Sequence, residues 1–321
     1  MRGRKFSRST TRRPGGERVD RVEIVEVGPR DGLQNEKRVL PTATKIEYVE
    51  RALAAGLRRL EVAAFARPDR VPQMADAEDV LRGVPRPEGV RYVALVLNGR
   101  GLDRILALDP IARPHEINYV VVATDEFARR NQGMDTMASL DGFRSVAERA
   151  RGAGLGVTLT VAAAFGCPFT GEVKTDRVRA VIAGAGPLDE LCLADTIGVG
   201  VPAQVIDLAA AAREAAPGVP LRAHFHNTRN TGYANAITAA GLGFAALDAS
   251  LGGIGGCPFA PAATGNIATE DLAYLLNRSG LETGVAVPRA AGTGTWIGAE
   301  LGLPQVPAQL GRAGDFPPPA A

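Results

Sequence analysis

Two histidines, His224 and His226, stand one residue apart in a chain that contains only three. They lie in the apolar segment 221–227, which follows the turn-forming residues 217–220, and this pattern predicts a short strand. On a strand, side chains at i and i+2 point to the same face, so the two imidazoles aim at one point with Cα atoms about 7 Å apart. Two neutral imidazoles directed at one point suit a divalent metal. The alternative is a pair of histidines on a solvated or buried face.

The elements that must position these histidines form a repeating pattern. Apolar, largely β-branched segments alternate with helical patterns, as expected of a parallel sheet covered on both faces. Eight such strand–helix units predict an α/β fold of the (β/α)8 TIM-barrel type, which takes about 250 residues. An open doubly wound sheet is the rival, but segment 28–32 is not a glycine-rich phosphate fingerprint. The predicted strands are 22–27, 59–65, 91–97, 116–123, 156–163, 190–194, 221–225 and 246–251. The predicted helices are 42–55, 74–83, 99–108, 139–153, 175–185, 203–215, 229–240 and 268–277.

This pattern divides the chain into three parts. Residues 1–20 are basic and rich in turn formers, so we expect a disordered tail. Residues 21–285 would form the TIM-barrel catalytic domain. Residues 286–321 are rich in Gly and Pro with little periodicity, and they predict an irregular C-terminal extension.

Polar residues gather where the predicted strands end, which is where TIM barrels place their active sites. Two imidazoles, a carboxylate and an amide oxygen would form an octahedral set for Mg²⁺ or Mn²⁺, and the absence of a thiolate disfavours structural zinc. Each carboxylate or amide could instead be a helix cap, a turn residue or the partner of an arginine. Their convergence at one rim favours a site. The residues are Arg30, Asp31, Glu61, Asp195, His224, His226 and Asn266.

One cysteine is a second candidate for chemistry. Cys257 follows a loop with four glycines in segment 252–256, and such a loop can approach and close over a substrate. A thiol there can act as an acid or base if its pKa is tuned. Cys167 and Cys192 are predicted to be packing residues.

Composition excludes several classes of protein. The net charge is +2 over 321 residues, and much of the positive excess lies in the first 21, so no nucleic-acid-binding surface is expected. Three widely spaced cysteines suggest reduced thiols rather than a disulfide framework. With no membrane-length apolar run and no secretory apolar region, the sequence predicts a cytoplasmic protein without a membrane partner.

Segment 25–36 resembles the opening signature of the 3-hydroxy-3-methylglutaryl-CoA lyase family, whose members are metal-dependent enzymes on a TIM barrel. Further matches lie at 71–74, 166–169, 194–200, 252–260 and 265–271, so the resemblance extends over about residues 22–285. It implies retro-Claisen cleavage of a 3-hydroxy-3-methylglutaryl-CoA-like 3-hydroxyacyl-CoA to acetyl-CoA and a keto acid. It also implies Mg²⁺ or Mn²⁺ as cofactor, an acyl-CoA as substrate and a homodimer.

The resemblance assigns roles to individual residues. The implied metal ligands are Asp31, His224, His226 and Asn266. The implied catalytic residues are Arg30, which faces the reacting oxygens, Cys257, the thiol of the mobile loop, and Glu61 and Asp195 as polar supports. The implied substrate-binding residues are Gln34 and Asn131.

Departures from the family pattern concern the expected pocket wall. Val62-Ala63-Ala64 stands where the family has hydroxylated residues, Asn227 stands at a usually acidic position, and segment 229–231 and Thr160 also differ. These changes predict a different, larger or less polar, acyl chain. The remaining alternatives are a Claisen-type acyl-CoA synthase, disfavoured by the Gly-Gly-Cys-Pro loop, and a non-catalytic metal-binding barrel that acts as a scaffold.

Overall fold

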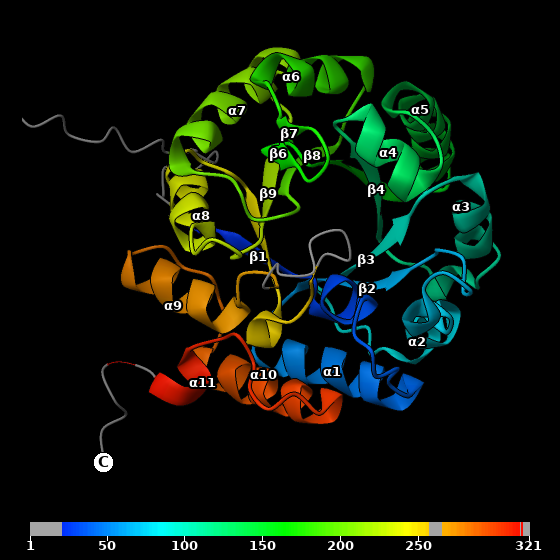
Figure 1. Cartoon of the computed structure of the whole chain (residues 1–321). Helices are drawn as coiled ribbons and strands as arrows, with labels where there is room; N and C mark the ends of the chain where they lie inside the picture. Colours follow the sequence, from blue (N-terminus) through cyan, green and yellow to red (C-terminus); the bar gives the residue numbers. More distant parts are fainter. Residues whose placement is uncertain (1–20, 257–264, 315, 317–321) are drawn as a thin grey trace, which may run out of the picture.

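The computed structural model describes residues 21–256, 265–314 and 316. Within them, eight parallel strands close into a barrel in the order β1-β10-β9-β8-β5-β4-β3-β2, which confirms the predicted TIM barrel (Figure 1). The first and last strands of the barrel pair in parallel, with Glu23 opposite Ala246. The barrel strands are β1 (Glu23–Glu26), β2 (Arg59–Ala64), β3 (Arg91–Val96), β4 (Glu116–Val122), β5 (Gly156–Ala162), β8 (Glu190–Asp195), β9 (Leu221–Phe225) and β10 (Ala246–Ala249).

Helices surround the barrel and cover its outer face (Figure 1). The strands carry apolar residues on both faces because one face meets these helices and the other meets the barrel interior. All eight predicted helices are present, with ends that differ by a few residues. They are α1 (Thr42–Ala54), α2 (Ala77–Gly83), α3 (Gly99–Leu106), α5 (Thr136–Gly152), α6 (Thr175–Gly184), α7 (Pro202–Ala215), α8 (Gly232–Gly241) and α9 (Thr269–Arg278).

The N-terminal end of the barrel interior is filled by charged side chains, which we call the basal network: Glu23, Arg59, Arg91, Glu116 and Glu190. The buried guanidinium of Arg59 donates to Glu116 at 3.0 Å and to Glu190 at 2.7 and 2.8 Å. Arg91 joins Glu23 at 2.6 Å and Glu116 at 2.9 Å. Because each buried charge has an opposite partner, this layer can replace the branched apolar residues usual in such barrels.

The C-terminal extension differs from its prediction. Its residues are not all irregular, because α10 (Val287–Leu301) is a 15-residue helix and α11 (Leu310–Ala313) a short one. Glycines within α10 obscure its helical pattern in the sequence, yet they let the helix approach its neighbours closely. Figure 1 shows α10 alongside α1, where the rings of Trp296 and Tyr48 lie 6.2 Å apart. The predicted domain boundary at residue 285 stays a prediction.

Several short elements were not predicted. The polar turn after β1 is a π-helical turn, η1 (Gly28–Gly32), and a charged helix, α4 (Asp125–Gln132), follows β4. The others are η2 (Pro72–Met74), η3 (Pro110–Ala112), η4 (Leu251–Gly253) and the hairpin of β6 (Gly166–Cys167) and β7 (Gly171–Glu172).

Some predictions concern residues that the structure leaves undescribed. The tail 1–20 and Cys257 lie outside the described residues. Cys167 and Cys192 are buried, in agreement with a packing role. None of the helices in the described ranges is long and apolar enough to cross a membrane.

Candidate metal centre and pocket

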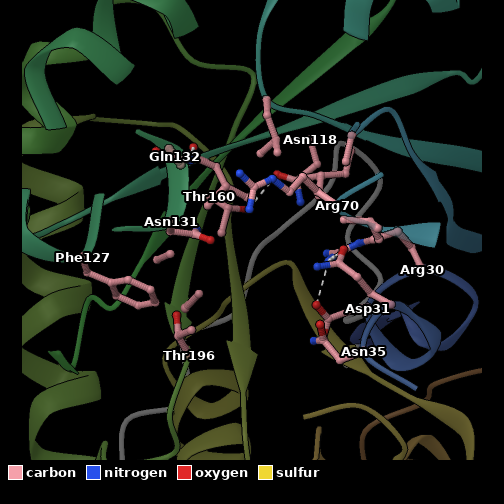
Figure 2. A pocket seen from close by; sticks show the side chains of 18 of the residues that line it. Arg30, Asp31, Asn35, Arg70, Asn118, Phe127, Asn131, Gln132, Thr160 and Thr196 are labelled. Atoms are coloured by element: carbon pink, nitrogen blue, oxygen red, sulfur yellow. Dashed lines mark hydrogen bonds and ion pairs between the residues drawn. The ribbon is translucent and has the colours of Figure 1, made fainter. Parts of the chain in front are cut away.

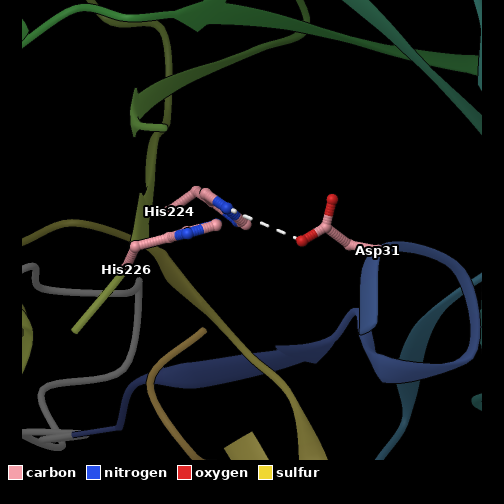
Figure 3. Close-up of side chains that lie close together, drawn as sticks. All are labelled: Asp31, His224 and His226. Carbon is pink, nitrogen blue, oxygen red and sulfur yellow. Dashed lines mark ion pairs between the residues drawn. The ribbon is translucent and has the colours of Figure 1, made fainter. Parts of the chain in front are cut away.

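Three predicted metal ligands meet at the C-terminal ends of the barrel strands. Asp31 comes from η1, His224 from β9, and His226 from just beyond the end of β9, and Figure 3 shows both imidazoles and the carboxylate directed toward one point. One ligand atom from each residue lies within 4.8 Å of the others, with His224 Nε2 4.0 Å from Asp31 Oδ2. An octahedral ion with bonds of about 2.1 Å separates its ligand atoms by about 3 to 4.2 Å, so only a small contraction of this cluster would hold one.

Asn266, the fourth predicted ligand, lies beside this cluster and contacts Asp31. Its Nδ2 donates to Asp31 Oδ2 at 2.8 Å and to the carbonyl of Ile254 at 3.2 Å. Its Oδ1 and the Nδ1 of His226 are buried without a hydrogen-bond partner in the described part of the chain. Buried atoms with lone pairs are costly without a partner, so two of them beside a carboxylate and a second imidazole fit a cation site. The residues present therefore fit the divalent metal that the sequence predicted.

The protonation of His226 and Asp31 favours metal binding. Burial, together with the neighbouring His224, lowers the pKa of His226 to about 4, so its imidazole is neutral at pH 7. Burial would raise the pKa of Asp31, but Arg30 and then the two histidines hold that pKa well below its ordinary value. A neutral imidazole and an ionised carboxylate are the forms that ligate metals.

Asp248, on β10, is a site residue that the sequence analysis missed. Its Oδ2 lies 3.1 Å from His224 Nδ1, so a proton on Nδ1 leaves Nε2 free to face Asp31. Burial disfavours the charged form of His224, but the Asp248 hydrogen bond and the charge of Asp31 outweigh burial and raise its pKa. The sequence feature that could have identified Asp248 is an acidic residue inside an otherwise apolar strand.

Arg30 is held rigidly beside the cluster. Its Nε donates to Glu61 Oε1 at 2.9 Å and its Nη1 to Asp31 Oδ1 at 2.7 Å, with Gln34 Oε1 at 3.5 Å. Glu61 is fully buried and also lies 3.5 Å from the amide of Asn118. Glu61 therefore lies behind Arg30 as its ionic partner, and Arg30 and Gln34 both line the pocket.

Asp195 lies at the end of β8, away from the pocket lining formed by described residues. Its two oxygens accept the backbone N–H groups of Val199 and Gly200 at 2.9 and 2.8 Å. This is the turn-forming arrangement that the sequence analysis gave as its alternative. Asp195 therefore fixes the loop after β8, and its predicted catalytic role stays a prediction.

The cluster opens into a pocket of about 810 Å³ (Figure 2). One wall is polar, because Thr160 donates to Asn118 Oδ1 at 2.7 Å and Asn131 and Gln132 of α4 lie nearby. Five arginines line it, and the acidic lining residues, Asp31 and Asp248, are both engaged with cationic or imidazole partners. The arginines are Arg30, Arg67, Arg70, Arg129 and Arg130. The pocket is therefore electropositive and suits an anionic ligand.

Three of the four departures, segments 62–64 and 229–231 and residue Asn227, do not line the pocket formed by the described residues. Val62, Ala63 and Ala64 are buried, and they do not line the pocket formed by the described residues. Asn227 instead accepts the N–H of Gly232 at 3.2 Å and closes the turn before α8. Thr160, the fourth position, does line the pocket.

The loop that precedes Cys257 adjoins the pocket. Gly255 has a φ of +103°, and a Cβ there would lie 2.8 Å from the Asn266 amide. Asn35 Nδ2 donates to the carbonyl of Gly256 at 2.7 Å, and Gly256 lines the pocket. The described end of the glycine loop therefore lies beside the metal cluster. Cys257 itself lies outside the described residues.

Comparisons with known proteins agree with this architecture. The family model described as HMGL-like matches residues 21–295. The (R)-citramalyl-CoA lyase of Chloroflexus aurantiacus is 43% identical over 94% of this chain and 97% of its own length. The mitochondrial hydroxymethylglutaryl-CoA lyase of Rattus norvegicus is 39% identical over 86% of this chain and 85% of its own. An HMG-CoA lyase from Acinetobacter baumannii, solved with coenzyme A and 3-methylmalate, superposes with a TM-score of 0.87 at 34% identity, over 94% of this chain and 98% of that one.

The closed barrel and its Asp–His–His cluster define a TIM-barrel enzyme with a candidate metal centre at the carboxyl ends of its strands. Among such enzymes, the chain belongs to the HMGL-like family, whose model covers most of its length.

Proposed function

We propose that this enzyme is a metal-dependent carbon–carbon lyase that cleaves a carboxylate-bearing 3-hydroxy-3-methylacyl-CoA to acetyl-CoA and a keto acid. The observation that carries the proposal is the cluster of Asp31, His224 and His226 inside an electropositive pocket that also holds Arg30. The relatives named hydroxymethylglutaryl-CoA lyase and (R)-citramalyl-CoA lyase support the reaction class.

Asp31, His224, His226 and Asn266 would hold the divalent metal, with Mg²⁺ or Mn²⁺ favoured by the oxygen and imidazole ligands. When bound, the metal would supply Lewis acidity to the C3 hydroxyl and to a neighbouring carbonyl or carboxylate oxygen. A base at the site accepts the proton of the C3 hydroxyl, a carbonyl forms at C3 as the C2–C3 bond breaks, and the electron pair of that bond passes to the thioester as an enolate. The C3 fragment leaves as the keto acid.

Arg30 stabilises the oxyanion that develops in this step. Its guanidinium is fixed by Glu61 on one side and Asp31 on the other, so its remaining N–H groups are directed without reorganisation during the reaction. We propose that Cys257 donates the proton that converts the enolate at C2 into acetyl-CoA. Gln34 and Asn131, which line the pocket, would contact the acyl group.

The charge at the pocket suits coenzyme A as the carrier of the acyl group. Arg67 is paired with Asp69 and Arg130 with Glu126, whereas Arg70 makes no hydrogen bond or salt bridge with a side chain of the described residues. An uncompensated guanidinium at a pocket lining is suited to phosphate or carboxylate oxygens. We therefore propose an acyl-CoA substrate bound with its anionic groups toward this side.

An assay of acetyl-CoA release tests the function. The panel contains 3-hydroxy-3-methylglutaryl-CoA, (R)-citramalyl-CoA and longer 3-hydroxyacyl-CoAs, each with Mn²⁺, with Mg²⁺ and with a chelator. We expect metal-dependent cleavage of at least one of the first two thioesters. Condensation of acetyl-CoA with a keto acid and no cleavage would favour a synthase. Metal binding without turnover of any thioester would favour a non-catalytic barrel.

We further propose a cytoplasmic homodimer. The human 3-hydroxy-3-methylglutaryl-CoA lyase, 38% identical over 86% of this chain, is named cytoplasmic, whereas the rat relative is named mitochondrial. Light scattering of the purified enzyme tests the oligomeric state, since a dimer has twice the 33.5 kDa chain mass.

A further inference from the structure

A fully buried arginine lies beneath the metal centre, between it and the basal network. Arg222 is on β9, two residues before His224, and its side chain has no exposed surface. Its Nε donates to Asp248 Oδ1. Its Nη2 lies 3.6 Å from Glu61 Oε2 and its Nη1 lies 3.8 Å from Glu190 Oε2. One guanidinium thus faces three buried carboxylates.

Two of these carboxylates, Asp248 and Glu61, contact residues of the metal centre, each through a different hydrogen bond. Asp248 uses one oxygen for Arg222 and the other for His224 Nδ1 at 3.1 Å. Glu61 holds the Nε of Arg30, which in turn holds Asp31. Arg222 therefore contacts Asp248, which holds His224, and Glu61, which holds Asp31 through Arg30, although it contacts neither ligand itself.

Arg222 makes a hydrogen bond with only one of the three carboxylates, that of Asp248, among the described residues. Neither Nη1 nor Nη2 has a hydrogen-bond partner among the residues that the structure describes, whereas Nε is bonded to Asp248. The contact with Asp248 is therefore the directional one, and the contacts with Glu61 and Glu190 compensate charge at longer range.

We propose that Arg222 is a positioning residue for the metal centre: it fixes the Asp248 carboxylate, which orients His224 so that Nε2 faces the metal. Asp248 can accept His224 Nδ1–H only if its carboxylate keeps one rotation, and the guanidinium on its other oxygen sets that rotation. Such outer contacts commonly change metal affinity by about ten- to a hundredfold when they are removed. This inference rests on the metal site of the proposed function.

The test is titration of Mn²⁺ into the full-length protein, followed by the electron paramagnetic resonance signal of free Mn²⁺. Arg222→Lys keeps a positive charge among the carboxylates but cannot reproduce the Nε contact. Asp248→Asn keeps the shape but has one oxygen for two partners. We expect each variant to bind Mn²⁺ about ten- to a hundredfold more weakly than the wild-type protein, with the double variant no weaker than the weaker single one.

The basal network provides a matched control. Arg59 is also buried and pairs with Glu23, Glu116 and Glu190, and none of these three contacts a proposed metal ligand within the described part of the chain. Arg59→Lys should lower the melting temperature and leave Mn²⁺ affinity unchanged. Unchanged affinity in a folded Arg222→Lys protein, an additive loss in the double variant, or an equal loss in Arg59→Lys would each overturn the inference. A wild-type protein that binds no Mn²⁺ would instead refute the metal site of the proposed function.

Discussion

At the scale of single residues, the side chains gathered at the strand ends could be predicted, but the buried ionic contacts between neighbouring strands could not. His224 and His226 are two positions apart, so the strand period alone directs them together. Asp248 and Arg222 are 26 residues apart in sequence and meet only because β9 and β10 are neighbours in the barrel. A single sequence gives the presence of charges in apolar strands, but it does not give their partners.

Cys257 carries a prediction at this scale. Cys257→Ala should keep metal affinity and lose most turnover, because the thiol would donate a proton without binding the metal. Single-turnover assays with Mn²⁺ titration measure the two properties separately, and Cys167→Ala serves as the control for loss of a thiol. Turnover that stays at the wild-type level would refute the role of Cys257.

Arg70 carries a second prediction. Arg70→Ala should raise KM about 10- to 100-fold with little change in kcat, because a charge-assisted contact of about 1.5–3 kcal/mol to a distal anionic group of the substrate would be lost. Arg130→Ala is the comparison, since Arg130 is already paired with Glu126 and lies over the ring of Phe169. Steady-state kinetics on the best substrate give both constants. An equal rise of KM in the two variants would contradict a special role for Arg70.

At the scale of elements, the long segments were predictable and those with unusual composition were not. The eight barrel strands have runs of apolar residues that predict a strand without knowledge of their neighbours in the fold. Helix α4 buries just Phe127 and Ala128 in its eight residues, so it has no apolar period to detect. Helix α10 contains three glycines, which lower helix propensity, and its stability comes from packing against α1 and η4.

Gly294 of α10 tests that packing. A Cβ there would lie 2.2 Å from Glu270 Oε1 and 2.7 Å from the backbone nitrogen of Gly252. Gly294→Ala should therefore destabilise the enzyme by about 1–3 kcal/mol and lower kcat by displacing η4. Gly292→Ala is the control, because no described heavy atom lies within 4 Å of its Cβ. It should be neutral or stabilising by about 0.5–1 kcal/mol, and urea unfolding distinguishes the two variants.

Two buried carboxyl groups connect η1, η4 and α9. Glu26 accepts the N–H groups of Gly28 and Leu251, and Glu270 accepts that of Gly252. Burial raises the pKa of Glu26 to about 7 and that of Glu270 to about 8. Because both values exceed those of an unfolded chain, stability from these groups is complete below about pH 4.5 and is lost as the pH rises through 7 to 8.

The corresponding variant is Glu270→Gln, which keeps an acceptor for Gly252 but cannot ionise. Its free energy of unfolding should improve relative to that of the wild-type protein between pH 5 and pH 9. Urea unfolding at pH 5, 7 and 9 measures the difference, with Glu88→Gln at an exposed position as the control. A difference that does not change with pH would show that Glu270 keeps an ordinary pKa.

At the scale of the whole molecule, the number of strand–helix units determined the fold prediction. Eight strand–helix units are compatible with few folds. The closed barrel is the fold in which every strand pairs on both sides and is covered by helices. The pocket wall was less predictable, because a position on a strand does not say whether its side chain faces the cavity or a helix. Ala63 and Ala64 illustrate this, since they lie on a barrel strand and are buried away from the pocket lining.

Metal binding should stabilise the whole molecule. Mn²⁺ at 100 times its Kd should add about 2.7 kcal/mol to the free energy of unfolding, because the ion binds the folded state. A melting curve with and without chelator measures the change. His226→Ala should fold but show no such shift, since it lacks one ligand. A shift of the same size in His226→Ala would place the ion elsewhere.

The pairing of β1 with β10 has a consequence for synthesis. Asp31 emerges from the ribosome early and Asn266 near the end, yet the two side chains lie 2.8 Å apart in the finished barrel. A nascent chain that stops before residue 266 therefore holds only part of the proposed ligand set, however well its earlier units have folded. Metal uptake thus reports closure of the ring, and a circular permutant with new ends between α4 and α5 should bind the ion with unchanged affinity.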